Sequence, residues 1–103
     1  MIIRIVKMNF REEEVDSFLQ LFHNVKHKIR QFPGCQKLEL LQDINKSNTL
    51  FTYSYWDSED ALNLYRNSEL FAETWKNTKK GFSEKAEAWS VEQLVVLNDN
   101  ILN

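Results

Sequence analysis

The strongest constraint on the fold is a stripe of apolar side chains that recurs every three or four residues and stops at a proline–glycine pair. Its members are Val15, Phe18, Phe22, Val25, Ile29 and Phe32. This spacing predicts an amphipathic helix, and the acidic residues 12–14 lie where the positive end of the helix dipole favours them. Pro33 disfavours helix at the residue before it, and Gly34 accepts the turn that follows. We therefore expect one long helix early in the chain.

Strand-like segments lie on both sides of this helix. Alternating side chains predict strands over Ile2–Phe10, Cys35–Ile44, Thr49–Trp56 and Lys85–Leu97, and the polar turn 45–48 joins the second and third strands as a hairpin. Apolar residues occur on both faces of these strands, which is typical of strands that are covered on both sides.

The segment between the third and fourth strands predicts two shorter helices. Asp57 or Ser58 caps the first and Ser68 caps the second, since short polar side chains bind the free N–H groups of a helix start. The inner stripe of the second helix consists of Phe71, Trp75, Thr78 and Phe82. The order is β-α-β-β-α-β with a broken second helix. This order predicts an α+β, ferredoxin-like fold with a four-stranded antiparallel sheet and helices on one face.

Size and composition favour a single small domain, which we place at residues 1–97, followed by a polar tail at 98–103. A net charge of -2 disfavours nucleic acid and anionic membranes as partners. No apolar run is long enough for a membrane helix, and the charged opening segment is unlike a signal peptide. Cys35 is the single cysteine of the sequence, so we expect a reducing, cytoplasmic location. Its thiol is either packed and unreactive or reactive.

The surplus of apolar strand positions predicts a homodimer. Helices on one side of the sheet leave the other apolar side without cover. A second copy, packed sheet against sheet, would cover it, and two-fold dimers are the commonest oligomers.

Aromatic side chains are concentrated in Leu50–Lys79, which holds seven of the thirteen in the chain: Phe51, Tyr53, Tyr55, Trp56, Tyr65, Phe71 and Trp75. Two interpretations are open. These rings either pack the core or form the wall of a pocket for a flat aromatic ligand.

Three charged or titratable residues have alternative interpretations. Arg4 lies on an otherwise apolar strand face, either as an edge residue that reaches solvent along its stem or as a partner for a ligand. His23 and His27 share a helix at i, i+4 spacing but point away from the apolar stripe. A solvated face, a metal site and a proton-transfer role all remain open for them.

Three short segments resemble the antibiotic biosynthesis monooxygenase (ABM) domain family: Phe32-Pro33-Gly34-Cys35, the strand-ending Trp56, and Ser68-Glu69-Leu70-Phe71. The resemblance covers Ile2 to Leu97. It implies a dimeric α+β barrel with a ligand pocket between the sheet and the helices of each subunit. Members of this family oxidise polycyclic phenols or quinols with dioxygen alone, degrade haem, or isomerise phosphorylated sugars.

The resemblance also allows two of these activities to be weighed. Haem-degrading members use a strand asparagine, a helix tryptophan and a histidine ligand ten residues later, and these positions fall near Arg4, on Tyr65 and on Trp75. Without a histidine at Trp75, axial haem ligation is lost there. A sugar phosphate needs several donors, and only Arg4, Lys7 and Arg66 qualify by pattern.

The remaining activity is a cofactor-independent monooxygenase that acts on a small aromatic quinol or polyphenol. No metal or cofactor is expected. The resemblance places Trp75, Tyr65, Phe71, Trp56 and Tyr53 in the pocket wall. Proton handling would fall to Tyr53, Tyr65, His23 or Arg4, and the residues alone do not choose among them. The alternative is a non-catalytic dimer of the same fold that binds a small ligand or is associated with stress.

Overall fold

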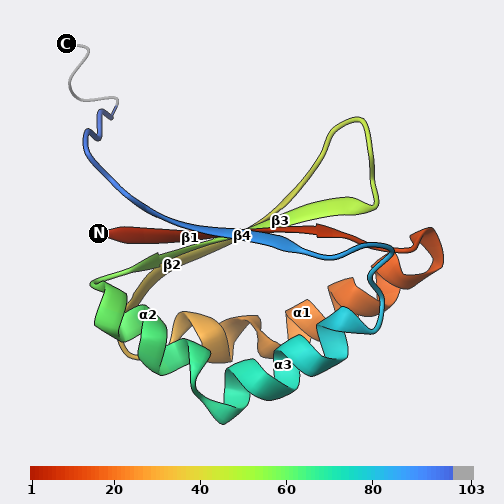
Figure 1. Ribbon diagram of the computed structural model, residues 1–103, viewed down its shortest axis with the longest axis horizontal. Helices are drawn as coiled ribbons and strands as arrows, with labels where there is room; N and C mark the ends of the chain where they lie inside the picture. Colours follow the sequence, from red (N-terminus) through yellow and green to blue (C-terminus); the bar gives the residue numbers. More distant parts are fainter. Residues whose placement is uncertain (99–103) are drawn as a thin grey trace.

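The computed structural model, which describes residues 1–98, is a four-stranded antiparallel sheet with three helices on one face (Figure 1). The elements in chain order are β1 (Ile2–Asn9), the 3-10 helix η1 (Glu12–Glu14), α1 (Val15–Arg30), β2 (Cys35–Gln42), β3 (Thr49–Trp56), α2 (Glu59–Arg66), α3 (Glu69–Lys79) and β4 (Glu87–Glu92). The predicted β-α-β-β-α-β order and the broken second helix are confirmed. The predicted tail at 98–103 lies outside the described residues from position 99 onward.

The strands lie in the order β2-β3-β1-β4, so β1 is paired on both sides. Arg4 lies opposite Ser54 of β3 and Ser90 of β4. Arg4 is therefore in the interior of the sheet, and its interpretation as an edge residue is wrong. Because alternate residues of a strand point to opposite faces, Arg4, Ser54 and Ser90 share the face that the helices cover.

The core consists of two clusters between this face and the helices. The first contains Met8, Phe10, Phe18, Phe22 and Leu50, and the second contains Cys35, Trp56 and Leu62. Trp56 is fully buried, and its indole Nε1 donates a hydrogen bond of 2.9 Å to Ser54 Oγ. A buried indole N–H without an acceptor costs free energy, so this bond fixes both side chains.

Two serine side chains cap the starts of α2 and α3, and the second of them lies at the break between these two helices. Ser58 Oγ accepts a hydrogen bond of 3.1 Å from the backbone N–H of Ala61 and so begins α2, which selects Ser58 from the two predicted caps. Ser68 Oγ accepts one of the same length from the N–H of Phe71 and begins α3. Ser68 Oγ also donates to the carbonyl of Tyr65 at 2.6 Å. The side chain of Ser68 thus hydrogen-bonds a carbonyl at the end of α2 and also caps the start of α3.

The turn before β2 depends on Gly34, which has a φ of 89°. L-residues rarely adopt this left-handed conformation, whereas glycine does so at little cost. A Cβ on Gly34 would lie 2.5 Å from the Cβ of Ala61. The glycine therefore serves both the turn and the close approach of α2.

The last strand is shorter than predicted. We expected Lys85–Leu97, but β4 ends at Glu92, which lies opposite Ile2. Beyond this point β1 offers only Met1, whose carbonyl accepts a final hydrogen bond from the N–H of Gln93. With no partner strand left in the subunit, four apolar side chains become exposed: Leu94, Val95, Val96 and Leu97.

The second strand also ends early, at Gln42 rather than Ile44. Asp43 Oδ1 accepts hydrogen bonds from the backbone N–H groups of Asn45 and Lys46, at 2.7 and 3.0 Å. This turn draws the backbone away from the sheet, and Ile44 is exposed as a result.

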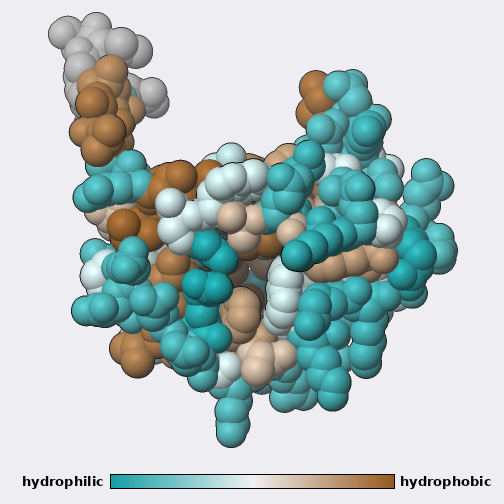
Figure 2. All heavy atoms as spheres, in the orientation of Figure 1, coloured by the Kyte–Doolittle hydropathy of each residue, from teal (hydrophilic) through white to brown (hydrophobic). Residues whose placement is uncertain are grey.

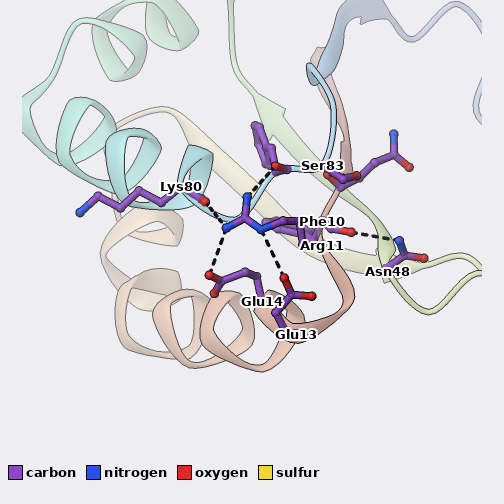
Figure 3. Close-up of polar contacts among 9 residues, drawn as sticks. Phe10, Arg11, Glu13, Glu14, Asn48, Lys80 and Ser83 are labelled. Atoms are coloured by element: carbon purple, nitrogen blue, oxygen red, sulfur yellow. Dashed lines mark hydrogen bonds and ion pairs between the residues drawn. The ribbon is translucent and has the colours of Figure 1, made fainter.

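The connection after α3 is held by Arg11, as Figure 3 shows. Its guanidinium donates to the carbonyl of Lys80 at 2.8 Å and to that of Phe82 at 3.0 Å. The same group forms ion pairs with Glu13 and Glu14 at 3.4 and 3.2 Å. These contacts join the segment after α3 to the start of α1.

None of the helices within residues 1–98 has the length and apolar character needed to cross a membrane.

Candidate functional site

A cavity of about 240 Å³ lies between the sheet and all three helices. Figure 2 shows the molecule hollowed at this place, with hydrophilic side chains along part of the margin and hydrophobic ones along the rest. Met8 and Phe18 of the first core cluster line it, as do Leu62 of the second cluster and the adjoining Tyr65. The cavity therefore lies between the two core clusters, and residues of both clusters line it.

One wall of the cavity is a row of aromatic rings from the broken helix. Tyr65 packs edge-on against Phe71 with ring centroids 5.3 Å apart, and Phe71 stacks on Trp75 with centroids 6.0 Å apart and planes 10° from parallel. All three rings line the cavity and are half-buried. Such a wall suits a flat aromatic ligand, which can bury its faces against it.

Two arginines line the same cavity. Arg4 rises from the middle of the sheet, and its Nη1 donates a hydrogen bond of 3.0 Å to Ser90 Oγ. Arg66 comes from the last turn of α2 and is exposed, which places it at the mouth of the cavity. Burial lowers the pKa of Arg4, and the positive charge of Arg66 lowers it further. An arginine remains protonated under such shifts, so both side chains present positive charge to the cavity.

Among the described residues of the lining, Tyr65 is the one phenol. Burial raises its pKa well above the ordinary value, and the neighbouring Cys35 adds to the effect. The hydroxyl therefore stays protonated near neutral pH, where it can donate a hydrogen bond but cannot act as a base. The ring itself is held by stacking on Trp56 and by an edge contact with Phe32.

The structure brings together some of the predicted site residues. Arg4, Tyr65, Phe71 and Trp75 all line the cavity. Trp56 does not, because it is buried behind the ring of Tyr65.

Two other predicted residues lie elsewhere. Tyr53 alternates with Thr52 and Ser54 along β3, so it points to the opposite face of the sheet, away from the helices. His23 is exposed on α1 beside Lys26, with its Nδ1 3.1 Å from Lys26 Nζ, and His27 is exposed as well. The solvated-face interpretation of the two histidines fits their positions.

Several polar side chains of the lining were not singled out from the sequence. These are Thr52, Ser54 and Thr74. Thr78 was placed only on the inner stripe of its helix, and Arg66 was considered only as a donor to a phosphate. A usable signal did exist on β3, where Thr52 and Ser54 interrupt a face that otherwise carries Leu50 and Trp56. Small polar residues on a buried face often mark a place where a ligand or water replaces packing.

The donor groups of the site suit an organic ligand better than a metal ion. Within residues 1–98, no three histidine, cysteine, aspartate or glutamate side chains are grouped so as to hold a metal. Among these described residues, the cavity lining contains no histidine, cysteine or carboxylate. The groups available for chemistry are two guanidinium cations, one protonated phenol and several hydroxyls.

Comparisons with known proteins place this architecture in a family. The model of the antibiotic biosynthesis monooxygenase family matches residues 1–77. A haem-degrading monooxygenase of Listeria monocytogenes is 30% identical over an alignment of 83 residues, and the match covers 76% of this chain and 49% of the relative. The chain thus spans about half the length of that curated relative.

Solved structures show the same fold. The crystal structure of an antibiotic biosynthesis monooxygenase superposes with a TM-score of 0.85 at 19% identity, over 92% of this chain and 100% of the other. A conserved protein from Methanosarcina mazei superposes with a TM-score of 0.84 at 20% identity, over 90% and 93% of the two chains. With the family match over residues 1–77, these findings show that the chain belongs to the antibiotic biosynthesis monooxygenase family.

Proposed function

We propose that this protein is a cofactor-independent monooxygenase that oxidises a small aromatic quinol or polyphenol in the cavity between the sheet and the helices. The observation that carries the proposal is the wall formed by Tyr65, Phe71 and Trp75 facing a cavity that also contains Arg4. The volume of about 240 Å³ is slightly below the roughly 300–1,000 Å³ of common ligand sites. A ligand of one to three rings is therefore favoured over a larger one.

The residues present can promote this chemistry by electrostatics. An electron-rich phenol passes an electron to dioxygen more readily once it has lost its proton. Positive charge from Arg4 and Arg66 lowers the pKa of a bound phenol, because it favours the phenolate. Tyr65 then donates a hydrogen bond to the phenolate oxygen, and the proton leaves to water at the mouth.

The oxygen balance of the reaction follows from the substrate. For a quinol, one atom of dioxygen is inserted at a ring C–H position, and the quinol becomes a hydroxyquinone. The other atom leaves as water together with two hydrogens of the quinol. No external reductant is needed, because the substrate supplies all the electrons. The aromatic wall supplies position and excludes bulk water.

Oxygen uptake tests the proposal directly. The metal-free protein, dialysed against chelator, is incubated with a panel of quinols and polycyclic phenols in an oxygen electrode. We expect uptake above the protein-free rate for at least one compound, with one labelled atom incorporated from isotopically labelled dioxygen. Uptake no faster than the protein-free rate across the panel would overturn the proposal.

A second candidate is a non-catalytic protein that binds a small ligand in the same cavity. It is favoured by the absence, among the described lining residues, of a carboxylate or histidine that could act as a general base. Binding of an aromatic compound without any oxygen uptake or product would support this candidate.

Haem degradation is a third candidate, suggested by the activity in the name of the Listeria monocytogenes relative. The donor set here does not fit a histidine-ligated haem, since His23 and His27 are exposed on α1 and do not line the cavity. We therefore rank it below the oxidation of a small phenol.

We further propose that two copies of the chain pack through the uncovered face of the sheet, as a dimeric α+β barrel. The helices lie on one side only (Figure 1). The register of the strands places apolar side chains from all four strands on the free side: Ile3, Ile5, Leu41, Phe51, Tyr53, Tyr55, Trp89 and Val91. The charged residues Lys7, Lys37, Glu39 and Glu87 lie on the same face. Large exposed apolar patches on a small protein mark an interface. The exposed segment 94–97 adds further apolar surface that a partner can cover.

A further inference from the structure

We propose that the ligand of the cavity is an aromatic acid whose carboxylate is bound by Arg4 and Arg66 together. This inference rests on the proposed function, because it concerns the same cavity. It narrows the substrate class from aromatic phenols in general to phenols that carry a carboxylate. Two guanidinium cations and one carboxylate leave one net positive charge at the site, which still favours the phenolate.

The first support is that neither arginine has an acidic partner in the part of the chain that the structure describes. The ion pairs there belong to Arg11 and Lys37. The chain as a whole carries 15 acidic and 13 basic residues, yet the described lining of the cavity contains two arginines and no acid. Glu92 lies on the same face of the sheet, beyond Ser90, but it forms no ion pair with either arginine and does not line the cavity.

The second support is the cost of this arrangement without a ligand. Two like charges that share a partly desolvated cavity repel each other and lose hydration. The pKa of Arg4 is lowered both by burial and by Arg66, which is the direction expected for a cation that lacks a counterion. A bound anion would offset both costs through its attraction to the two cations. Neutral side chains at these positions would have avoided them without any ligand.

The third support is geometric. The hydrogen bond from Arg4 Nη1 to Ser90 Oγ orients the guanidinium toward the β4 side. Within residues 1–98 it is the one hydrogen bond of this guanidinium, so its other N–H groups can bind a ligand. Arg66 is exposed at the mouth of the same cavity. A carboxylate matches the planar fork of a guanidinium with two parallel hydrogen bonds. The ring of the same ligand then lies against Phe71 and Trp75.

The test compares an aromatic acid with its neutral amide and with an aromatic phosphate. Hydroxynaphthoate and its neutral amide, hydroxynaphthamide, have nearly the same shape, and naphthyl phosphate presents a different anion. Isothermal titration calorimetry of the full chain measures each dissociation constant without requiring turnover. We expect the acid to bind about tenfold tighter than the amide or better, as two charged hydrogen bonds allow. Naphthyl phosphate tests whether the two arginines prefer a phosphate, which guanidinium groups also bind.

Matched variants locate the preference. Arg66→Gln alters an exposed side chain, so it should fold normally and reduce the preference for the acid several-fold. The double variant Arg4→Gln with Arg66→Gln should abolish it, and Arg66→Lys should retain part of it. Lys28→Gln removes one positive charge from an exposed position of α1, outside the cavity, and should leave the preference unchanged.

Three results would overturn the inference: equal binding of acid and amide, an unchanged preference in Arg66→Gln and in the double variant, or tighter binding of the phosphate than of the acid. These results are independent of oxygen uptake. A preference for the acid without oxidation of any phenol would reject the proposed function and keep this inference. Oxidation of neutral phenols together with equal binding of acid and amide would keep the proposed function and reject this inference.

Discussion

The ring of Tyr65 stacks on the indole of Trp56, with centroids 5.0 Å apart and planes 24° from parallel. Trp56 is fully buried and hydrogen-bonded to Ser54, so it forms a fixed platform for the tyrosine. The aromatic hydroxyl that Tyr65 presents to the cavity is therefore carried by a ring that has little freedom to move. Such preorganisation is what a hydrogen-bond donor to a developing negative charge requires.

Tyr65→Phe should separate chemistry from binding. The variant keeps the ring and its stacking but removes the hydroxyl, so the dissociation constant for an aromatic ligand should change little. The oxidation rate should fall by about tenfold or more, as expected for the loss of a hydrogen bond to a charged oxygen. Trp75→Phe serves as the matched change in the wall. It should raise the dissociation constant of the ligand by a larger factor than it lowers the oxidation rate of the bound substrate. Unchanged turnover in Tyr65→Phe would reduce this residue to a packing role.

Tyr65 should also contribute to the loss of stability at alkaline pH. Its pKa in the folded protein is raised above the ordinary value of 10.0, so the folded state binds this proton more tightly than the unfolded chain does. The resulting stability is fully present below about pH 10 and is lost as the pH rises from there toward the folded pKa. The free energy of unfolding, measured with urea at about pH 8 and about pH 11, should fall less in Tyr65→Phe than in the wild type. An equal fall in both proteins would contradict the assignment.

Gly34→Ala should destabilise the fold. The residue has a φ of 89°, and a new Cβ would lie 2.5 Å from the Cβ of Ala61. Strain of this kind costs of order 1–3 kcal/mol, and the collision with α2 adds to it. Urea denaturation should show a lower midpoint with a similar slope. Ser47→Ala, in an exposed turn, provides the control and should remain close to the wild type.

Trp89→Glu should convert the proposed dimer to a monomer. Trp89 lies on the uncovered face of the sheet and is 44% exposed in the single subunit, so a charge there would have to be desolvated in a sheet-to-sheet interface. Light scattering coupled to size exclusion should report half the mass of the wild type. Leu64→Glu is the control, because Leu64 is an exposed apolar residue on α2, on the helical side. A wild-type protein that is already a monomer at micromolar concentration would remove the basis for the prediction.

Haem titration should give no stoichiometric complex with a histidine-ligated spectrum. The histidines are both on the exposed face of α1, and the described lining of the cavity contains none. Absorbance titration of the protein with haemin, alongside the variant His23→Ala with His27→Ala, measures this. Saturable binding at one haem per subunit that survives the double variant would instead point to a haem site built on other ligands.

Much of the fold could be predicted because its signals are local. The stripe that contains Phe18, Phe22 and Ile29 determines one face of α1, and Ser58 and Ser68 cap the helices that follow them directly. The end of β4 could not be predicted in this way. It depends on where β1 begins, since Glu92 lies opposite Ile2. The apolar sequence of the segment 94–97, taken alone, predicts that the strand continues.

The site was only partly predictable for a related reason. Both faces of β3 carry apolar residues, so the sequence did not show which face meets the helices. Tyr53 was therefore expected in a cavity that Thr52 and Ser54 line instead. Trp56 lies on the correct face, but Tyr65 stands between it and the cavity, and such an order of packing emerges only when two elements are placed together.

The break between α2 and α3 has a consequence for how this scaffold can change. In an uninterrupted helix, Tyr65 and Phe71 would point about 120° apart around the axis. The break capped by Ser68 resets that angle, and the two rings meet with centroids 5.3 Å apart. Adding or removing a residue at this break would rotate the wall of Phe71 and Trp75 relative to Tyr65. The outline of the cavity could thus diverge between relatives through the length of one turn, with every lining residue retained.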